Sequence, residues 1–155
     1  MILDVTRSAD ALTYLRASLT PAEQQWPRFE PTLRAIKDVS IGELRTHPDL
    51  IERIVTIAPA REHVWILMGA PVLVTPTGAV YGFGFSMRTL GLRVGGDTRE
   101  FERVKTTTPR STGSEVVVLN DEWISIDAWM VKWSKADGIA ELKALTARAF
   151  EFASA

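Results

Sequence analysis

The fold of this chain is decided by the stretch Val80-Tyr81-Gly82-Phe83-Gly84-Phe85-Ser86-Met87-Arg88-Thr89-Leu90-Gly91-Leu92-Arg93-Val94. Aromatic residues alternate with glycine in its first half, and a period of two is typical of a pleated strand rather than a helix. A two-residue turn at Met87 and Arg88 would pair Gly84 with Gly91 and Gly82 with Arg93. The stretch therefore predicts a β-hairpin with three glycines side by side on one face.

These three glycines, Gly82, Gly84 and Gly91, would leave that face without side chains. Glycine weakens a strand, so a cluster of glycine usually marks a place where another group approaches the backbone closely. A packed helix or a bound ligand would satisfy this requirement, and the sequence alone leaves both alternatives open.

The preceding residues predict a second hairpin. In Thr75-Pro76-Thr77-Gly78, proline at the second position and glycine at the fourth suit a type I turn followed by a left-handed glycine. This turn pairs Val74 with Val80, Leu73 with Tyr81 and Val72 with Gly82. Both faces of the predicted sheet are then largely apolar, so both need a cover.

A third hairpin is predicted from Glu115–Leu119 and Glu122–Ala128 around the turn residues Asn120 and Asp121. Its expected register pairs Val118 with Trp123. One face of its second strand is aromatic and polar, with Trp123, Ser125, Asp127 and Trp129. These residues either cover the glycine patch by packing or form the wall of a ligand cleft or partner surface. Arg93 could pair with Asp127 if the two hairpins are neighbours.

Helices are predicted at both ends of the chain. Ser8 can cap a helix to Leu19, and Thr20-Pro21-Ala22-Glu23 starts another that stops near Trp26. Pro48 and Asp49 open an apolar helix, and Asp137 is the expected cap of the last one. The fold class is therefore α+β: an antiparallel β-meander of about five or six strands, with N-terminal short helices and a C-terminal amphipathic helix. At 155 residues, one domain over 1–155 is expected.

Composition excludes several chemistries. The chain has no cysteine, so it has no disulfide, no thiolate metal site and no cysteine nucleophile. His47 and His63 do not have a metal-binding spacing, and no phosphate-binding glycine loop or dinucleotide fingerprint is present. We therefore expect neither a metal nor a cofactor.

Charge and hydropathy bear on partners and location. The net charge is −1 with acidic and basic residues interspersed, which argues against a nucleic-acid partner. The N-terminal segment MILDVTRSADALTYL has no long apolar run, so we expect neither a signal peptide nor a membrane span. The absence of cysteine is compatible with a reducing cytoplasm, which is the expected location.

The expected function is a non-catalytic domain that binds a small ligand or a protein. The alternative is a small, cysteine-free, metal-independent enzyme whose site lies at the glycine-bare face. The candidate ligand-binding residues are Gly82, Gly84, Gly91, Arg93, Trp123, Ser125, Asp127 and Trp129. The expected partners are an unknown small molecule or protein and a second copy of the chain, since helices could cover one sheet face and a second subunit the other.

Overall fold

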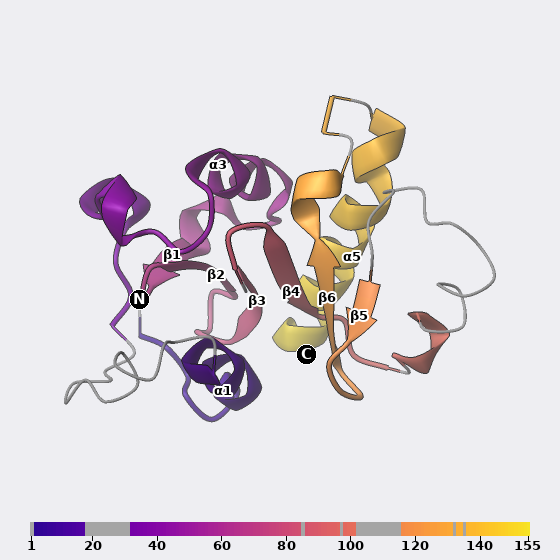
Figure 1. Cartoon of the computed structure of the whole chain (residues 1–155). Coiled ribbons are helices and arrows are strands. Elements are labelled where there is room, and N and C mark those ends of the chain that lie inside the picture. The colour runs from indigo at the N-terminus through magenta and orange to yellow at the C-terminus, as the bar shows by residue number, and fades with distance from the viewer. Residues whose placement is uncertain are drawn as a thin grey trace.

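Figure 1 shows the protein as a computed structural model, which describes residues 2–17, 32–84, 86–96, 98–101, 116–131, 133–134 and 136–155. One antiparallel sheet has the strand order β1-β2-β3-β4-β6-β5. Helices precede and follow the sheet, so the predicted α+β fold is confirmed. The helix predicted from Thr20 to Trp26 lies outside the described residues.

The elements have the following bounds. The α-helices are α1 (Ala9–Ala17), α3 (Pro48–Ile57) and α5 (Ala136–Ser154). Single turns of 3-10 helix are η1 (Ile36–Asp38), η2 (Ile41–Glu43), η3 (Arg61–His63) and η4 (Ala128–Met130). The strands are β1 (Val64–Leu67), β2 (Ala70–Val74), β3 (Val80–Gly84), β4 (Thr89–Arg93), β5 (Val116–Val118) and β6 (Trp123–Asp127).

Two of the predicted turns form as expected. Gly78 has a φ of 95° and donates its N–H to the Thr75 carbonyl at 2.9 Å, which closes the β2–β3 hairpin. The Asn120 side-chain oxygen accepts hydrogen bonds from the backbone N–H groups of Glu122 and Trp123, at 2.8 and 2.9 Å. These local bonds explain why the sequence pattern located both connections correctly.

Ser8 has a different role from the predicted helix cap. α1 begins at Ala9, and the Ser8 hydroxyl accepts a hydrogen bond from the backbone N–H of Val80 at 3.0 Å. Ser8 is almost completely buried. Its hydroxyl therefore fastens the start of α1 to the first residue of β3.

Helices cover both faces of the sheet. α3 and α5 bury one face, where Leu50, Ile54 and Leu142 join the core with Leu92 and Ile124. α1 covers the opposite face over β2 and β3, and its residues Ala11 and Leu15 belong to a second core cluster with Phe83 and Trp123. α1 and α5 thus contact β3 from opposite sides (Figure 1).

The register of β3 differs from the prediction because the strand contains a β-bulge. Val74 pairs with Val80 as predicted, but Leu73 pairs with Gly82, which leaves Tyr81 as an extra residue. The Tyr81 ring contacts Phe150 of α5, at 5.4 Å between ring centroids. A side chain at Gly82 would point at Leu73 on that same sheet face.

The register between β3 and β4 places the three glycines on different faces. Gly82 pairs with Leu92, Phe83 with Gly91 and Gly84 with Leu90, so the predicted pairing of Gly84 with Gly91 is wrong by one residue. Directly paired residues in an antiparallel sheet point to the same face. Gly82 and Gly84 therefore face the α3 and α5 layer, whereas Gly91 faces the α1 layer with Phe83. The predicted single glycine-bare patch does not form.

The last hairpin enters the sheet through its second strand. β6 lies between β4 and β5, and it pairs Arg93 with Trp123 and Gly91 with Ser125. Val118 pairs with Ile124 instead of the predicted Trp123. This order brings the β4 end that carries Arg93 next to the start of β6.

Candidate ligand-binding cleft

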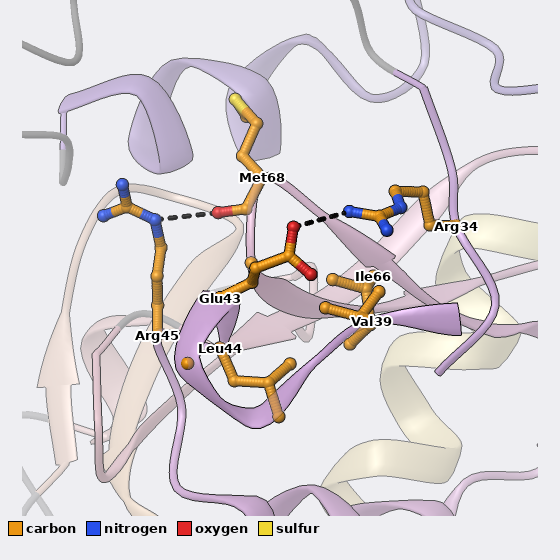
Figure 2. A pocket seen from close by; sticks show the side chains of 9 residues that line it. Arg34, Val39, Glu43, Leu44, Arg45, Ile66 and Met68 are labelled. Carbon is orange, nitrogen blue, oxygen red and sulfur yellow. Dashed lines mark hydrogen bonds and ion pairs between the residues drawn. The ribbon is translucent and has the colours of Figure 1, made fainter. Parts of the chain in front are cut away.

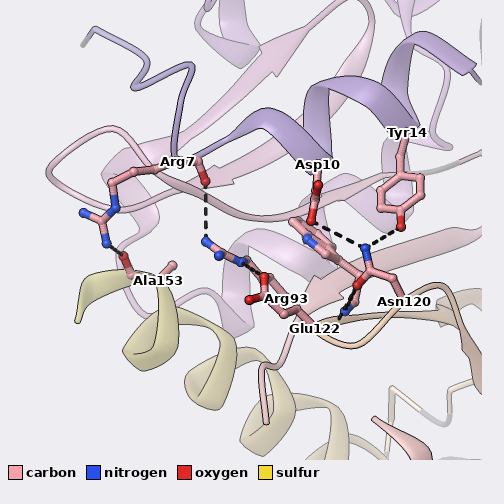
Figure 3. Close-up of polar contacts among 8 residues, drawn as sticks. Arg7, Asp10, Tyr14, Arg93, Asn120, Glu122 and Ala153 are labelled. Carbon is pink, nitrogen blue, oxygen red and sulfur yellow. Dashed lines mark hydrogen bonds and ion pairs between the residues drawn. The ribbon is translucent and has the colours of Figure 1, made fainter. Parts of the chain in front are cut away.

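A cleft of about 420 Å³ opens where the start of α1, the end of β4 and the end of α5 meet (Figure 3). It is formed by charged, aromatic and small residues in or next to these elements and by the first residue of β6. They are Thr6, Arg7, Ala9, Asp10, Arg93, Trp123, Phe152 and Ala155. Two of the predicted site residues, Arg93 and Trp123, are among them.

Arg93 is the central charged residue of the cleft. Its Nε donates to Glu122 Oε2 at 2.9 Å, and its Nη1 donates to the Arg7 carbonyl oxygen at 3.4 Å. The guanidinium carbon lies 5.0 Å from the centroid of the Phe152 ring, which is a cation–π distance. Among the described residues, no acceptor contacts its Nη2 group. The predicted pairing of Arg93 with Asp127 is wrong, because Glu122 takes that role.

Arg7 joins the two helices that border the cleft. Its Nη2 donates to the carbonyl oxygens of Ala153 and Ala155, at 2.6 and 2.9 Å. Its backbone N–H donates to Asp4 Oδ1 at 3.1 Å. Figure 3 shows the Arg7 side chain reaching toward Ala153 of α5, while its carbonyl oxygen faces Arg93. Arg7 therefore fixes the spacing between the start of α1 and the end of α5.

Asp10 supplies a negative charge on the α1 side. Asn120 Nδ2 donates to Asp10 Oδ2 at 3.4 Å and to the Tyr14 hydroxyl at 2.7 Å. Burial and the negative charge of Asp10 raise the pKa of Tyr14. Within the described part of the chain, Asp10 has no ion-pair partner. Its carboxylate thus lies at the cleft with only one long hydrogen bond.

Trp123 is an almost fully buried aromatic residue at this cleft. Its ring lies 5.3 Å from Phe83 and 6.2 Å from Tyr14 between centroids, so it also belongs to the core beneath α1. Its indole Nε1 is buried and has no hydrogen-bond partner among the described residues. The core-packing interpretation therefore applies to Trp123, which also lines the cleft.

The other predicted residues of β6 lie at its far end. Asp127 is four residues from Trp123, which corresponds to roughly 13 Å along a strand. Its carboxylate binds Arg88, with Nη2 and Oδ2 at 2.8 Å, and accepts the backbone N–H of Trp129 at 3.2 Å. Ser125 is buried between Gly91 and Val117. The structure therefore does not bring the predicted residues into one site.

Trp129 belongs to a separate aromatic and cationic cluster. Its strand has already ended, and Trp129 lies in η4. Its ring lies 4.8 Å from the His47 ring, and the Arg53 guanidinium carbon lies 5.7 Å from its centroid. Arg53 also lies over the Trp133 ring at 6.0 Å. This cluster connects η4 to α3.

Neighbouring side chains occupy the space beside each glycine of the predicted patch. A Cβ at Gly82 would come within 2.8 Å of Leu73 Cδ1, and one at Gly91 within 3.1 Å of the Phe83 ring. A Cβ at Gly84 would contact Thr46 Oγ1 and would lie 2.7 Å from Pro71 Cδ. The glycines thus permit close packing of side chains from neighbouring strands and of Thr46, whereas the sequence left open a packed helix or a bound ligand.

A larger cavity, about 550 Å³, lies beside the β1–β2 turn (Figure 2). Arg34 Nη1 binds Glu43 Oε1 at 3.1 Å, and Arg34 Nη2 donates to the Asp38 carbonyl at 2.8 Å. The Ser40 backbone N–H and Arg34 lower the pKa of Glu43. Arg45 Nε donates at 2.7 Å to the carbonyl of Met68, whose φ is 51°. These bonds hold the segment of η1 and η2 against β1, so we interpret the charged groups here as structural.

Sequence reasoning missed most of the smaller cleft. Arg7, Asp10 and Phe152 come from the two ends of the chain, and no local pattern connects them. The available signal was the position of Phe152 near the end of the predicted C-terminal amphipathic helix. Only the packing of α1 and α5 around β4 brings these residues to Arg93.

The described residues contain neither a metal-binding cluster nor a membrane-spanning helix. Among the described residues, no group of three or more histidine, cysteine, aspartate or glutamate side chains is placed to hold a metal ion. In the same residues, no helix has the length and apolar character needed to cross a membrane. Comparison of the chain with protein-family models, curated proteins and solved structures gave no match.

Proposed function

We propose that the protein is a small-ligand-binding domain whose site is the cleft between α1, β4 and α5. The environment of the Arg93 side chain is the main observation that supports this proposal. Its side chain is 22 % exposed, it lines a concave site beside Trp123 and Phe152, and its Nη2 group has no acceptor in the described residues. Ligand sites typically combine aromatic walls with a few such polar groups.

The protein-interaction alternative has less support. Trp129 is 39 % exposed and Met87 is 53 % exposed, and exposed aromatic residues are frequent in interfaces. The Trp129 ring, however, already packs against His47 and Arg53 within the protein. We therefore assign this cluster to the attachment of η4 to α3.

The enzyme alternative requires that the glycine-bare sheet face be open to solvent. Leu73, Pro71 and the Phe83 ring occupy the space beside the glycines, which favours binding at the other cleft. A cytoplasmic location remains part of the proposal, because a cysteine-free chain is compatible with a reducing compartment.

The experiment uses the indole N–H signal of Trp123 in nitrogen–proton correlation spectra of the full chain. A fragment panel with neutral, anionic, cationic and zwitterionic members is titrated into the protein. We expect at least one member to shift this signal saturably, because Trp123 lines the cleft. Arg93→Gln should abolish the shift.

Arg88→Gln is the matched control. Arg88 also contacts a carboxylate of β6, but at the opposite end of β4. Its removal should leave ligand binding intact. The proposal is rejected if no fragment moves the Trp123 signal at millimolar concentration, or if both arginine variants weaken binding equally.

A further inference from the structure

We infer that the ligand of this cleft is a small zwitterion, whose carboxylate binds Arg93 and whose ammonium group binds Asp10. This inference rests on the proposed function and adds the chemical class of the ligand. Amino acids with an apolar side chain are the simplest members of that class.

The positively charged side of the cleft has donor groups placed to bind a carboxylate. Glu122 and the Arg7 carbonyl hold the Arg93 guanidinium through Nε and Nη1, while Nη2 has no acceptor in the described part of the chain. Arg7 lines the same cleft, and its Nη2 is held by two carbonyl oxygens of α5. A planar guanidinium presents its N–H groups in a fixed geometry that matches a carboxylate. The held guanidinium group of Arg93 therefore defines where the acid of a ligand binds.

The negative side is formed by Asp10. It is exposed in the first turn of α1, and within the described residues one long hydrogen bond from Asn120 leaves most of its acceptor capacity available. An ammonium group carries three donors and no acceptor, so it complements this carboxylate.

The cleft offers charges of both signs. Arg7, Arg93 and Asp10 line it, and Glu122 lies beside it as the ion-pair partner of Arg93. A simple anion would leave Asp10 without a partner, and a simple cation would lie close to the two guanidinium groups. Since electrostatic complementarity discriminates between ligands, a molecule with one charge of each sign is favoured over either.

The aromatic residues explain why an apolar side chain is expected on the ligand. Trp123 and the half-buried Phe152 both line the cleft. Arg93 covers the Phe152 ring at 5.0 Å, so the apolar surface and the charged groups lie next to each other. A short molecule can therefore contact both.

The test compares compounds of one skeleton that differ in charge. L-Phenylalanine, 3-phenylpropionate and 2-phenylethylamine are titrated while the Trp123 indole signal is followed, with L-leucine as a second zwitterion. We expect at least one of the two amino acids to bind, with L-phenylalanine roughly tenfold tighter than either singly charged analogue. Asp10→Asn should reduce the affinity for L-phenylalanine to that for 3-phenylpropionate.

Asp49→Asn is the matched control, because Asp49 is also an exposed acid at the second residue of a helix but lies outside the cleft. It should leave all affinities unchanged. If 3-phenylpropionate binds the parent protein as tightly as L-phenylalanine, the zwitterion inference is overturned and the proposed function stands. The same conclusion follows if only other fragments bind. If nothing moves the Trp123 signal, both are overturned.

Discussion

Gly84 lies so close to Pro71 of the neighbouring strand that a Cβ added to it would be 2.7 Å from Pro71 Cδ. The same Cβ would also contact Thr46 Oγ1. A proline ring cannot rotate away, so either the strands or the Thr46 segment would have to move. The glycine at this position is therefore required by the contact of β3 with β2 and with the residues before α3.

Gly84→Ala should destabilise the protein by about 1–3 kcal/mol through overpacking. The midpoint of thermal unfolding should fall by roughly 2–4 °C per kcal/mol for a domain of this size. Gly42→Ala is the matched control, since nothing lies within 4 Å of its Cβ position, and it should be nearly neutral. Equal midpoints for the two variants would show that the β3 backbone is not tightly packed at Gly84.

Tyr81→Phe should be neutral or stabilising by up to about 1 kcal/mol. The Tyr81 hydroxyl is buried and has no hydrogen-bond partner among the described residues, so the folded protein bears its desolvation cost. Phenylalanine keeps the edge-to-face contact with Phe150. Urea unfolding near neutral pH measures the change in the free energy of unfolding. A decrease of more than about 1 kcal/mol would show that the hydroxyl has a hydrogen-bond partner in the folded protein.

Stability should decrease in alkaline solution above about pH 10. Burial raises the pKa of Tyr81 above its usual value of 10.0. Above this pH the unfolded chain releases the phenolic proton while the folded protein keeps it, so the unfolded state binds fewer protons and is favoured as pH rises. The free energy of unfolding, measured from about pH 8 to about pH 11, should show this decrease.

The same titration of Tyr81→Phe provides the control. Its decrease should be shallower, but Tyr14 will still contribute because its pKa is also raised. Identical pH profiles for the parent and the variant would show that Tyr81 is not the group responsible.

Asp127→Ala should lower the free energy of unfolding by about 1 kcal/mol. Asp127 accepts a hydrogen bond from the backbone N–H of Trp129 and caps the start of η4. Asp127→Asn keeps an oxygen acceptor and loses only the charge. Since the Arg88 side chain is half exposed, the ion pair itself contributes little, and the Asn variant should stay within about 0.5 kcal/mol of the parent. If the Asn variant is as unstable as the Ala variant, the charge and not the hydrogen bond is the important interaction.

A homodimer remains a prediction of the sequence. α1 covers the second sheet face over β2 and β3, so a partner would have to use another surface. β5 is at one end of the strand order, and Val117 on it is 44 % exposed. We expect light scattering at micromolar concentration to give twice the mass of the chain, and Val117→Lys to reduce it to one chain. A parent mass of one chain would contradict the prediction.

Local sequence patterns were sufficient for the fold class, for two of the turns and for the start of α3. Proline and glycine in Thr75-Pro76-Thr77-Gly78 limit the backbone to one tight turn, and Asn120 binds the N–H groups that follow it. Pro48 can begin a helix because the first helical N–H needs no partner, and α3 begins there. These are interactions between residues close in sequence, so their outcome can be predicted without the fold.

Register and the cleft were decided by tertiary structure. Both faces of β3 are apolar and buried. A shift of one residue at the Tyr81 bulge moves side chains from one buried face to the other, and the hydrophobic pattern of the sequence does not reveal this shift. The cleft brings Arg7 of the N-terminal segment and Phe152 of α5 to Arg93 of β4. Contacts between residues so distant in sequence form only when α1 and α5 pack on the sheet, and no periodicity within a single element encodes them.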